Sequence, residues 1–261
     1  MRVEKPTTEI STFDEKGIYI RGKSLVDDLI GEVTFTDMIY FQILGKMPTE
    51  GERRILDAVL VTLVDHGMLG AVGARMVYMG APDYIQGAIA AGILGMGSQF
   101  GGVMEQVGGH LDEVMDASDP DAKAREIVSS YRSQRKPVPG FGHPHHRPED
   151  PRTPKLLGVA EGAGVPGKHI AALKTLARAV DESLGKHITI NATAGMAALL
   201  GEIGVPSSIM RGFAAISRAP GIVGHIYEEQ QRPAGYYIGM LAQESVPYTG
   251  TIPHAEGQGQ D

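Results

Sequence analysis

The chain has 261 residues, which is enough to bury a sizeable core in one domain or in two small lobes. Its net charge of −7 argues against a nucleic-acid backbone as the main partner, and the lack of cysteine excludes a disulfide framework and thiol chemistry. No apolar run approaches membrane-spanning length, and the N-terminus lacks the apolar core of a signal peptide. We therefore expect a soluble cytoplasmic protein.

The first elements change from a strand period to a helical period. Residues 7–22 alternate apolar and polar side chains around a turn at residues 14–17, which predicts a short hairpin. From Leu25 onward the apolar residues recur at helical spacing, and one such run ends at Gly45 before Pro48. A third helix begins at about Gly51 and carries Asp65 and His66 at its C-terminal end.

Residues 84–98 are nearly free of charge and rich in small residues, which permit close helix packing. We expect this helix in the interior. It leads to Gly101 and Gly102, a turn where the backbone can approach a ligand closely. No GxGxxG after a strand and no Walker-type lysine occur here, so these glycines do not indicate a nucleotide-binding fold.

The second half predicts further helices with capping residues at their ends. The expected helices run from Asp119-Pro120 to about Gln134, from residues 165–167 to Gly185, from 194 to 203 with Asn191 as the cap, and from residues 206–208 to Arg218. Pro220-Gly221 and Arg232-Pro233 are expected to break the remainder, and residues 254–261 to fray. Without a repeat or a run of strands, the pattern predicts an all-α protein.

Residues 140–152 form a segment in which proline and glycine exclude a regular helix. The segment contains three histidines, two arginines and two carboxylates, which are residues that move protons and hold anions. Composition alone favours an ordinary solvated turn. The alternative is a fixed loop that presents these groups to a cleft.

The Gly-Phe-Gly-His string at 140–143, with Arg152 nine positions after His143, resembles the active-site loop of the citrate synthase superfamily. Other segments resemble the same superfamily in the same order: 19–22, 35–48, 64–67, 97–102, 191–193, 215–218 and 232–233. The resemblance implies an all-α, two-lobe helical fold with a short N-terminal β-hairpin. It assigns 1–100 and 207–261 to a large lobe and 101–206 to a small lobe.

The resemblance is closer to one branch of the superfamily. Citrate synthases have a histidine in the Gly-Gly turn, whereas citryl-CoA lyases and the C-terminal module of ATP-citrate lyase have a phenylalanine there, as this chain does at Phe100. It implies a homodimer or higher homo-oligomer that binds acyl-CoA and a 2-oxo or hydroxy polycarboxylic acid. It implies no metal, and no cofactor other than the coenzyme A thioester, which is a substrate.

The resemblance also assigns roles to individual residues. Arg152, Arg218 and Arg232 would clamp the carboxylates of the oxo acid, with His66 as a further donor, because the rigid fork of arginine suits carboxylates. His143 would handle the hydroxyl proton. Alternative roles are a surface pair between Arg152 and Asp150, and an interaction of Arg218 with the C-terminus of its own helix. The acyl-CoA pocket would contain Phe100, Gly101, Gly102, Gly140, Phe141 and Gly142.

The chain departs from the superfamily at two positions. Thr193 stands where the superfamily has the aspartate that removes the α-proton of the thioester, and Pro144 replaces the arginine that usually follows the loop histidine. A threonine hydroxyl is no general base near neutral pH without a base of its own. As a donor to the thioester oxygen it could contribute about 3 kcal/mol, which favours cleavage over synthesis.

Three alternatives remain open at this point. His143, His145, His146 and Asp150 could bind zinc, although no second ligand pair supports such a site. The loss of the aspartate could mark a non-catalytic protein that binds acyl-CoA or the oxo acid on the same fold. A citrate synthase-type transferase is the third alternative.

Overall fold

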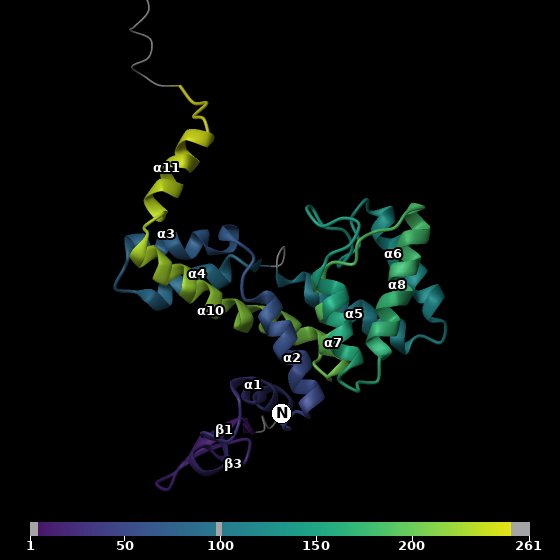
Figure 1. Ribbon diagram of the computed structural model, residues 1–261, viewed down its shortest axis with the longest axis horizontal. Coiled ribbons are helices and arrows are strands. Elements are labelled where there is room, and N and C mark those ends of the chain that lie inside the picture. Colours follow the sequence, from purple (N-terminus) through teal and green to yellow (C-terminus); the bar gives the residue numbers. More distant parts are fainter. Residues whose placement is uncertain (1–4, 98–100, 252–261) are drawn as a thin grey trace, which may run out of the picture. The chain divides into compact units, whose positions relative to one another are not determined.

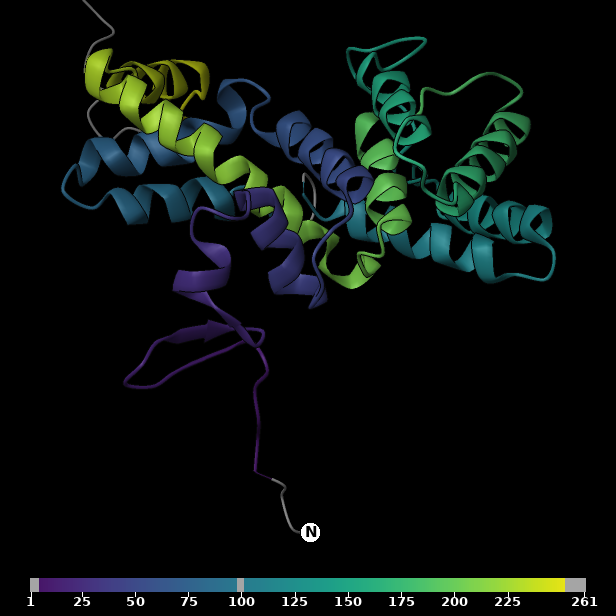
Figure 2. The same ribbon diagram turned by 60° about the horizontal axis from the view of Figure 1, so that its bottom comes forward.

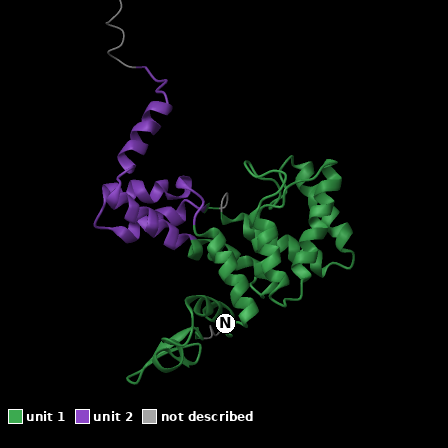
Figure 3. Ribbon diagram, viewed as in Figure 1, with its two compact units in different colours: residues 1–64, 97–217 green, residues 65–96, 218–261 purple. Residues whose placement is uncertain are grey.

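The computed structural model describes residues 5–97 and 101–251 of the chain. The chain is mainly helical and forms two compact units (Figure 3): unit 1 contains residues 1–64 and 97–217, and unit 2 contains residues 65–96 and 218–261. The lobes expected from the resemblance have other boundaries and stay a prediction. In the described part of the chain, no single helix is long and apolar enough to cross a lipid bilayer; only the bent pair 50–63 and 68–80, taken together, reaches that length and composition.

The N-terminal part of unit 1 is a small antiparallel sheet with the order β1 (Ser11–Phe13), β2 (Ile18–Ile20) and β3 (Lys23–Ser24). Ser11 lies opposite Ile20, and the backbone N–H of Asp14 donates to the carbonyl oxygen of Gly17, 3.0 Å away, across the turn. The predicted hairpin is therefore confirmed, and β3 adds a third strand. A π-helical turn, η1 (Leu25–Leu29), follows the sheet.

Two helices then form with the ends that their sequences predict. Helix α1 (Phe35–Leu44) begins with a capping box between Thr34 and Asp37, and it ends at Gly45, whose φ of 74° is left-handed. Helix α2 (Glu50–Leu63) begins with a second capping box, between Thr49 and Glu52. Each box satisfies backbone donors that the first turn of a helix leaves unpaired.

The core of unit 1 is built around α9 (Ala192–Glu202), in which every residue from 194 to 201 is buried. Helix α9 contacts α2, α5 (Val103–Asp116), α7 (Arg152–Glu161) and α8 (Lys168–Leu184). Helix α6 (Pro120–Ser133) packs on α5 and α8, and Figure 1 shows these three helices in teal and green. The short η4 (Ser207–Ile209) then leads into α10 (Met210–Gln231). Because α9 is surrounded on all these sides, its N-terminus is held firmly within unit 1.

Capping residues explain the ends of these helices as well. The side chain of Asp119 accepts a hydrogen bond from the backbone N–H of Ala122 at the start of α6, and Asn191 does the same for Ala194 at the start of α9. Helix α8 ends at Gly185, which has a positive φ of 64°. The sequence predicts these three ends, whereas α5 and α7 are not among the helices that it predicts.

Unit 2 packs α3 (Val72–Gly80), α4 (Ile85–Leu94) and the second part of α10 around Ala74, Ala88, Ile222 and Ile226. Figure 2 shows α10 in yellow-green running along the blue helices α3 and α4. A short 3-10 helix, η2 (Met68–Ala71), precedes α3, and α11 (Gly235–Ser245) contacts α3.

Two predictions about unit 2 are wrong. Helix α4 is not interior: Ala88 and Gly92 are buried, but Leu94 is 80% exposed, because its small residues serve close packing on one face only. A Cβ at Gly92 would lie 2.8 Å from the side chain of Ile222. Pro220 does not break α10, because a proline removes one helical hydrogen bond while core residues such as Ile222 still hold the helix. The break at Arg232-Pro233 is confirmed, since α10 ends at Gln231.

Candidate active site

The loop 140–152 is bound to the extended segment that precedes α9. The backbone N–H of Gly142 donates to the carbonyl oxygen of Thr189 at 2.7 Å, and that of Asn191 donates to the carbonyl oxygen of Gly140 at 3.0 Å. Between them, Phe141 pairs with Ile190 in an antiparallel bridge. The segment is therefore a fixed loop and not a solvated turn.

Glycine is required where this loop approaches α9 most closely. Gly140 has a φ of 87°, and a Cβ there would lie 2.8 Å from the Cβ of Ala194 and from the side chain of Val107. Gly142 has a φ of 88°, a conformation that side chains with a Cβ rarely adopt. The two predicted pocket glycines thus bring His143 close to the start of α9.

The imidazole of His143 is oriented by its own loop. Its Nδ1 accepts hydrogen bonds from the backbone N–H groups of His145 at 3.1 Å and His146 at 3.0 Å, and its ring stacks on that of His146. Two donors at Nδ1 disfavour a proton on that atom, so a neutral ring carries its proton on Nε2. His143 is therefore a donor through Nε2, which suits an oxygen that gains negative charge.

Thr193 lies in the first turn of α9 and is half-buried. Asn191 joins this turn to the loop, because its Oδ1 accepts from the N–H of Ala194 while its Nδ2 donates to the carbonyl oxygen of Gly142 at 3.1 Å. The N-terminus of a helix favours negative charge. The structure thus brings the His143 loop and Thr193 together at a helix end that suits an anion.

Arg152 begins α7 and forms a two-pronged contact with Asp150: its Nε donates to Oδ1 at 3.0 Å and its Nη2 to Oδ2 at 2.8 Å. Asp150 is fully buried, so this is not the surface pair that was the alternative. Burial raises the pKa of Asp150, but the hydrogen bonds from Arg152 and from the N–H of Ala192 outweigh it and lower that pKa to about 2. Asp150 thereby holds Arg152 against the start of α9.

A cavity of about 520 Å³ lies beside the loop, lined by Gly142, His143, Arg147, Pro148 and the segment 186–189. Two of its side chains, Arg147 and Lys186, are cationic. Arg147 donates from Nε to the carbonyl oxygen of His143 at 3.2 Å, and Lys186 lies on the wall formed by the segment 186–189. His187 also lines the cavity, and its hydrogen bonds with Asp181 and Glu149 raise its pKa.

No binding role for these side chains is predicted from the sequence. The sequence does mark the position of two of them as the start of a loop, because Lys186 and His187 directly follow the glycine that ends α8. Nothing in the sequence places them beside Arg147, nearly forty positions earlier.

Unit 2 holds the other three predicted anion-binding residues. His66 is exposed in the turn between α2 and η2, and Arg232 is exposed in the turn between α10 and α11. Arg218 lies inside α10, which continues to Gln231, so it does not act on the C-terminus of its own helix. Burial lowers the pKa of Arg218, and its Nε has no hydrogen-bond partner among the described residues. A buried donor without a partner is costly, which is consistent with an anionic ligand there.

Two other parts of the prediction concern the glycine turn and metal binding. Phe100 lies outside the described residues, while Gly101 and Gly102 are buried directly before α5. Across residues 5–97 and 101–251, no group of three or more His, Cys, Asp or Glu side chains is arranged to hold a metal ion. Both oxygens of Asp150 are already engaged, so the structure gives the zinc alternative no support.

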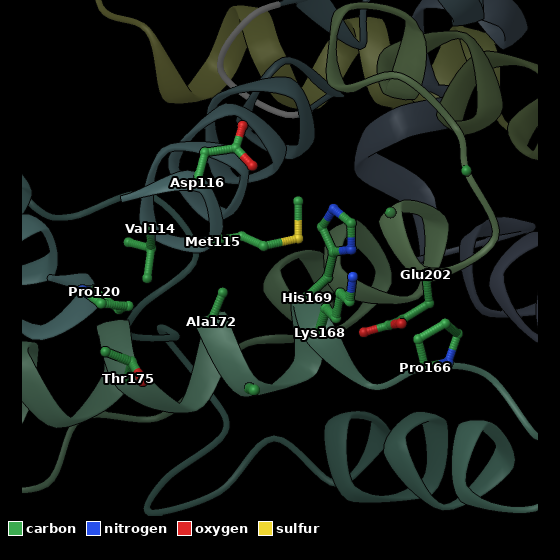
Figure 4. Close-up of a pocket in the computed structure, with 13 residues that line it drawn as sticks. Val114, Met115, Asp116, Pro120, Pro166, Lys168, His169, Ala172, Thr175 and Glu202 are labelled. Atoms are coloured by element: carbon green, nitrogen blue, oxygen red, sulfur yellow. The ribbon is translucent and has the colours of Figure 1, made fainter. Parts of the chain in front are cut away.

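A second cavity of unit 1, about 630 Å³, lies between α5, α8 and the end of α9. Figure 4 shows Met115, Lys168, His169 and Glu202 around it. The carboxylate of Glu202 accepts hydrogen bonds from the backbone N–H groups of Gly167 and Ile170, so it already caps the start of α8. No predicted site residue lines this cavity, and we place the active site at the loop instead.

Comparisons with known proteins identify the family of the chain. The family model "Citrate synthase, C-terminal domain" matches residues 42–236. Putative citrate synthase 2 of Mycobacterium bovis is 28% identical over 193 residues, which are 70% of this chain and 51% of that protein. The chain thus spans about half the length of the curated relatives that it matches first.

Solved structures share the fold. Citryl-CoA lyase from Hydrogenobacter thermophilus has 33% sequence identity and a TM-score of 0.85, with 95% of both chains covered. ATP citrate lyase from Methanothrix soehngenii, solved in complex with citrate and coenzyme A, has 20% identity and a TM-score of 0.74, with 99% of this chain and 44% of that chain covered. The predicted all-α, citrate synthase-like fold is confirmed, and the chain belongs to the citrate synthase family.

Proposed function

We propose that this chain is a citryl-CoA lyase-like enzyme that cleaves the C–C bond between the α-carbon of an acyl-CoA and a 2-oxo acid. The likeness to a citryl-CoA lyase over 95% of both chains supports this reaction class. The same family also contains citrate synthases, so the choice between cleavage and synthesis has to be argued from the residues of the site. Thr193 at the position of the usual aspartate favours cleavage.

The cavity beside the loop suits the phosphates of coenzyme A. Arg147 and Lys186 give it two cationic groups, and phosphate oxygens are strong acceptors for such donors. Both ring nitrogens of His187 are already bound to the carboxylates of Asp181 and Glu149, so its charge is offset and it supplies no further donor. The thioester would then reach from this cavity toward His143 and Thr193.

The carboxylates of the oxo acid would be held by arginines. The partnerless Nε of Arg218 is a donor that a carboxylate satisfies. Arg152 uses Nε and one hydrogen of Nη2 for Asp150, which leaves Nη1 for a ligand. Arg232 and His66 are exposed and would add further donors.

In the cleavage direction, the substrate hydroxyl loses its proton to water and its oxygen becomes a carbonyl, while the electrons of the C–C bond leave with the thioester as an enolate. The α-carbon of the enolate then takes up a proton from water, which gives the shorter acyl-CoA. We expected His143 to take the hydroxyl proton. Its tautomer instead favours donation from Nε2 to the oxygen as the proton leaves to water. The Thr193 hydroxyl, at the N-terminus of α9, would donate to the enolate oxygen.

The observation that carries this proposal is the attachment of the Gly-Phe-Gly-His loop to the start of α9 through Asn191. It fixes two donors, His143 and Thr193, on neighbouring segments. The two donors would stabilise the enolate that forms by cleavage, and Thr193 at the position of the usual aspartate provides no carboxylate to remove an α-proton for synthesis.

Incubation of the purified protein with citryl-CoA tests the proposal, with mass spectrometry of acetyl-CoA and oxaloacetate as the readout. We expect both products. Assays of other 3-hydroxyacyl-CoA thioesters of polycarboxylic acids would then define the range of substrates that the protein cleaves. Exchange of acetyl-CoA α-protons with deuterated water, together with citrate formation, would favour the transferase instead.

The non-catalytic alternative also has an observation in its favour, which is the missing aspartate at Thr193. Tight binding of coenzyme A and a dicarboxylate in calorimetry, without any turnover, would establish it. A cytoplasmic homodimer or higher homo-oligomer is part of the proposal, and analytical ultracentrifugation of the pure protein tests the assembly.

A further inference from the structure

A fully buried arginine of unit 2, Arg75 on α3, stands at the centre of a polar network. It is 1% exposed, and its Nη1 donates to Oε2 of Glu229 at 2.7 Å. Its Nη2 contacts Oε2 of Glu228 and Nδ1 of His225, the latter at 3.1 Å. Two carboxylates neutralise Arg75, so its charge is not available to a substrate. Its function lies in the residues that it holds.

The direction of the hydrogen bonds at His225 follows from this contact. A guanidinium can only donate, so Nδ1 of His225 is the acceptor and its proton lies on Nε2. Nε2 then donates to Oδ2 of Asp65 at 2.8 Å. The other oxygen of Asp65 accepts the backbone N–H of Gly67 at 2.7 Å. Asp65 therefore closes the turn that contains His66.

The other end of the network closes a second turn. Oε1 of Glu229 accepts the backbone N–H groups of Ala234 at 2.9 Å and Gly235 at 2.7 Å, at the start of α11. Gly235 leaves little room for a side chain, because its Cβ would lie 3.1 Å from Glu229 and 3.3 Å from the backbone of Arg75. The turn that Glu229 closes contains Arg232.

Asp65 also affects Arg218, the third residue of unit 2 that we expect to bind an anion. Although burial lowers the pKa of Arg218, the negative charge of Asp65 favours its protonated form. The network thus holds the turn that contains His66 and the turn that contains Arg232, and the charge of Asp65 stabilises protonated Arg218. These are the three residues of unit 2 that we expect to hold the carboxylates of the oxo acid.

We infer that Arg75 and His225 are positioning residues for carboxylate binding: they touch no ligand, and they hold the turns of His66 and Arg232 through Asp65 and Glu229. The inference rests on the proposed function. It adds that affinity for the oxo acid depends on which ring nitrogen of the half-buried His225 donates and which accepts.

Two variants of His225 separate positioning from mere packing. In His225→Gln, the amide oxygen can accept from Arg75 while the amide nitrogen donates to Asp65; in His225→Leu, both bonds are lost. Arg75→Met is a poorer test, because it leaves the buried carboxylate of Glu229 unpaired and is expected to unfold unit 2. His169→Leu, which breaks a similar histidine–aspartate pair in unit 1, is the matched control.

We expect His225→Leu to raise the KM for citryl-CoA, and the Kd for oxaloacetate, by ~10-fold or more, as loss of a charge-assisted hydrogen bond implies. Affinity for coenzyme A should not change, and His225→Gln should restore most of the loss. The His169→Leu control should bind oxaloacetate as the wild type does. Equal oxaloacetate binding by His225→Leu and wild type would overturn the inference.

A readout without ligand keeps this test independent of the proposed reaction. Amide hydrogen exchange in the free protein reports on the turns themselves. The Gly67 amide should exchange faster in His225→Leu than in wild type, and His225→Gln should exchange like the wild type. Unchanged exchange at Gly67 refutes the positioning role. Absence of any carboxylate binding by the wild-type protein refutes the proposed function instead.

Discussion

The side-chain amide of Asn191 donates a hydrogen bond to the carbonyl oxygen of Gly142, 3.1 Å away. Through this contact the residue that caps α9 also fixes the loop of His143. The first turn of α9 carries Thr193, so one side chain sets the relation between the two groups that we expect to act on the substrate. Substitutions of His143 and Thr193 can therefore be compared in a site where Asn191 keeps the loop and the start of α9 joined.

Thr193→Asp should lower citryl-CoA cleavage by more than the ~10²–10³ of one lost oxyanion donor, because a negative charge would face the forming enolate. Thr193→Val should lose that factor alone, and Thr193→Ser should retain activity through its hydroxyl. Steady-state rates of the three variants check this order. Faster cleavage by Thr193→Asp would show that Thr193 is a poor base and not a donor.

His143→Asn should keep the fold and the affinity for ligands while lowering turnover by ~10²–10³, the loss expected for one misplaced donor to the oxygen. His145→Asn is the control from the same loop. The side chain of His145 is exposed, so its loss should change the rate little. Circular dichroism and kcat for both variants test this difference. An equal loss in both variants that added zinc restores would support the metal alternative.

Binding of a di- or tricarboxylate should raise the melting temperature, since a ligand at 100 times its Kd stabilises the folded state by about 2.7 kcal/mol. Arg218→Ala should abolish this shift, because the partnerless guanidinium donor is removed. Thermal melts with and without citrate provide the measurement. A full shift in Arg218→Ala would exclude that residue from the site.

Lys186→Ala should weaken binding of coenzyme A about tenfold, and the loss should shrink at high salt because the contact is between charges. Lys168→Ala removes the same kind of charge from the cavity between α5, α8 and α9 and is the control. Calorimetry at two salt concentrations distinguishes the two cavities. A larger effect at Lys168 would move the coenzyme A site there.

Asp150 should make the stability of the protein depend on acid pH. Its folded pKa of about 2 lies below the ordinary 3.8, so its contribution is complete above about pH 4 and is lost as the pH falls toward 2. The shift corresponds to about 2 kcal/mol in the free energy of unfolding. Chemical denaturation of Asp150→Asn should show that loss at pH 6 and a smaller one at pH 3.

The exposed pair of Asp121 and Arg178 provides the comparison for this prediction. Asp121→Asn should change the unfolding free energy little at either pH, because exposed ion pairs contribute only about 0–1 kcal/mol. Equal effects of the two substitutions would mean that burial of Asp150 does not determine its contribution.

The sequence by itself determined the features that depend on neighbours along the chain. Thr34, Asp119 and Asn191 cap helices because their side chains reach a backbone N–H two or three residues away. Gly45 and Gly185 end helices because they adopt a positive φ. The all-α fold follows from such local patterns, whereas the family and the segments of the candidate site follow from motifs that resemble the superfamily in the same order.

Only the tertiary structure decided which distant groups meet. Arg75 and Glu229 are 154 positions apart, and no local pattern indicates that they form a buried ion pair. Arg147 lines the same cavity as Lys186 and His187 because the loop pairs with the segment before α9. Pro220 likewise stays helical because Ile222 and Ile226 are packed in a core. Burial and pairing depend on every element of a unit at once, which a local pattern does not contain.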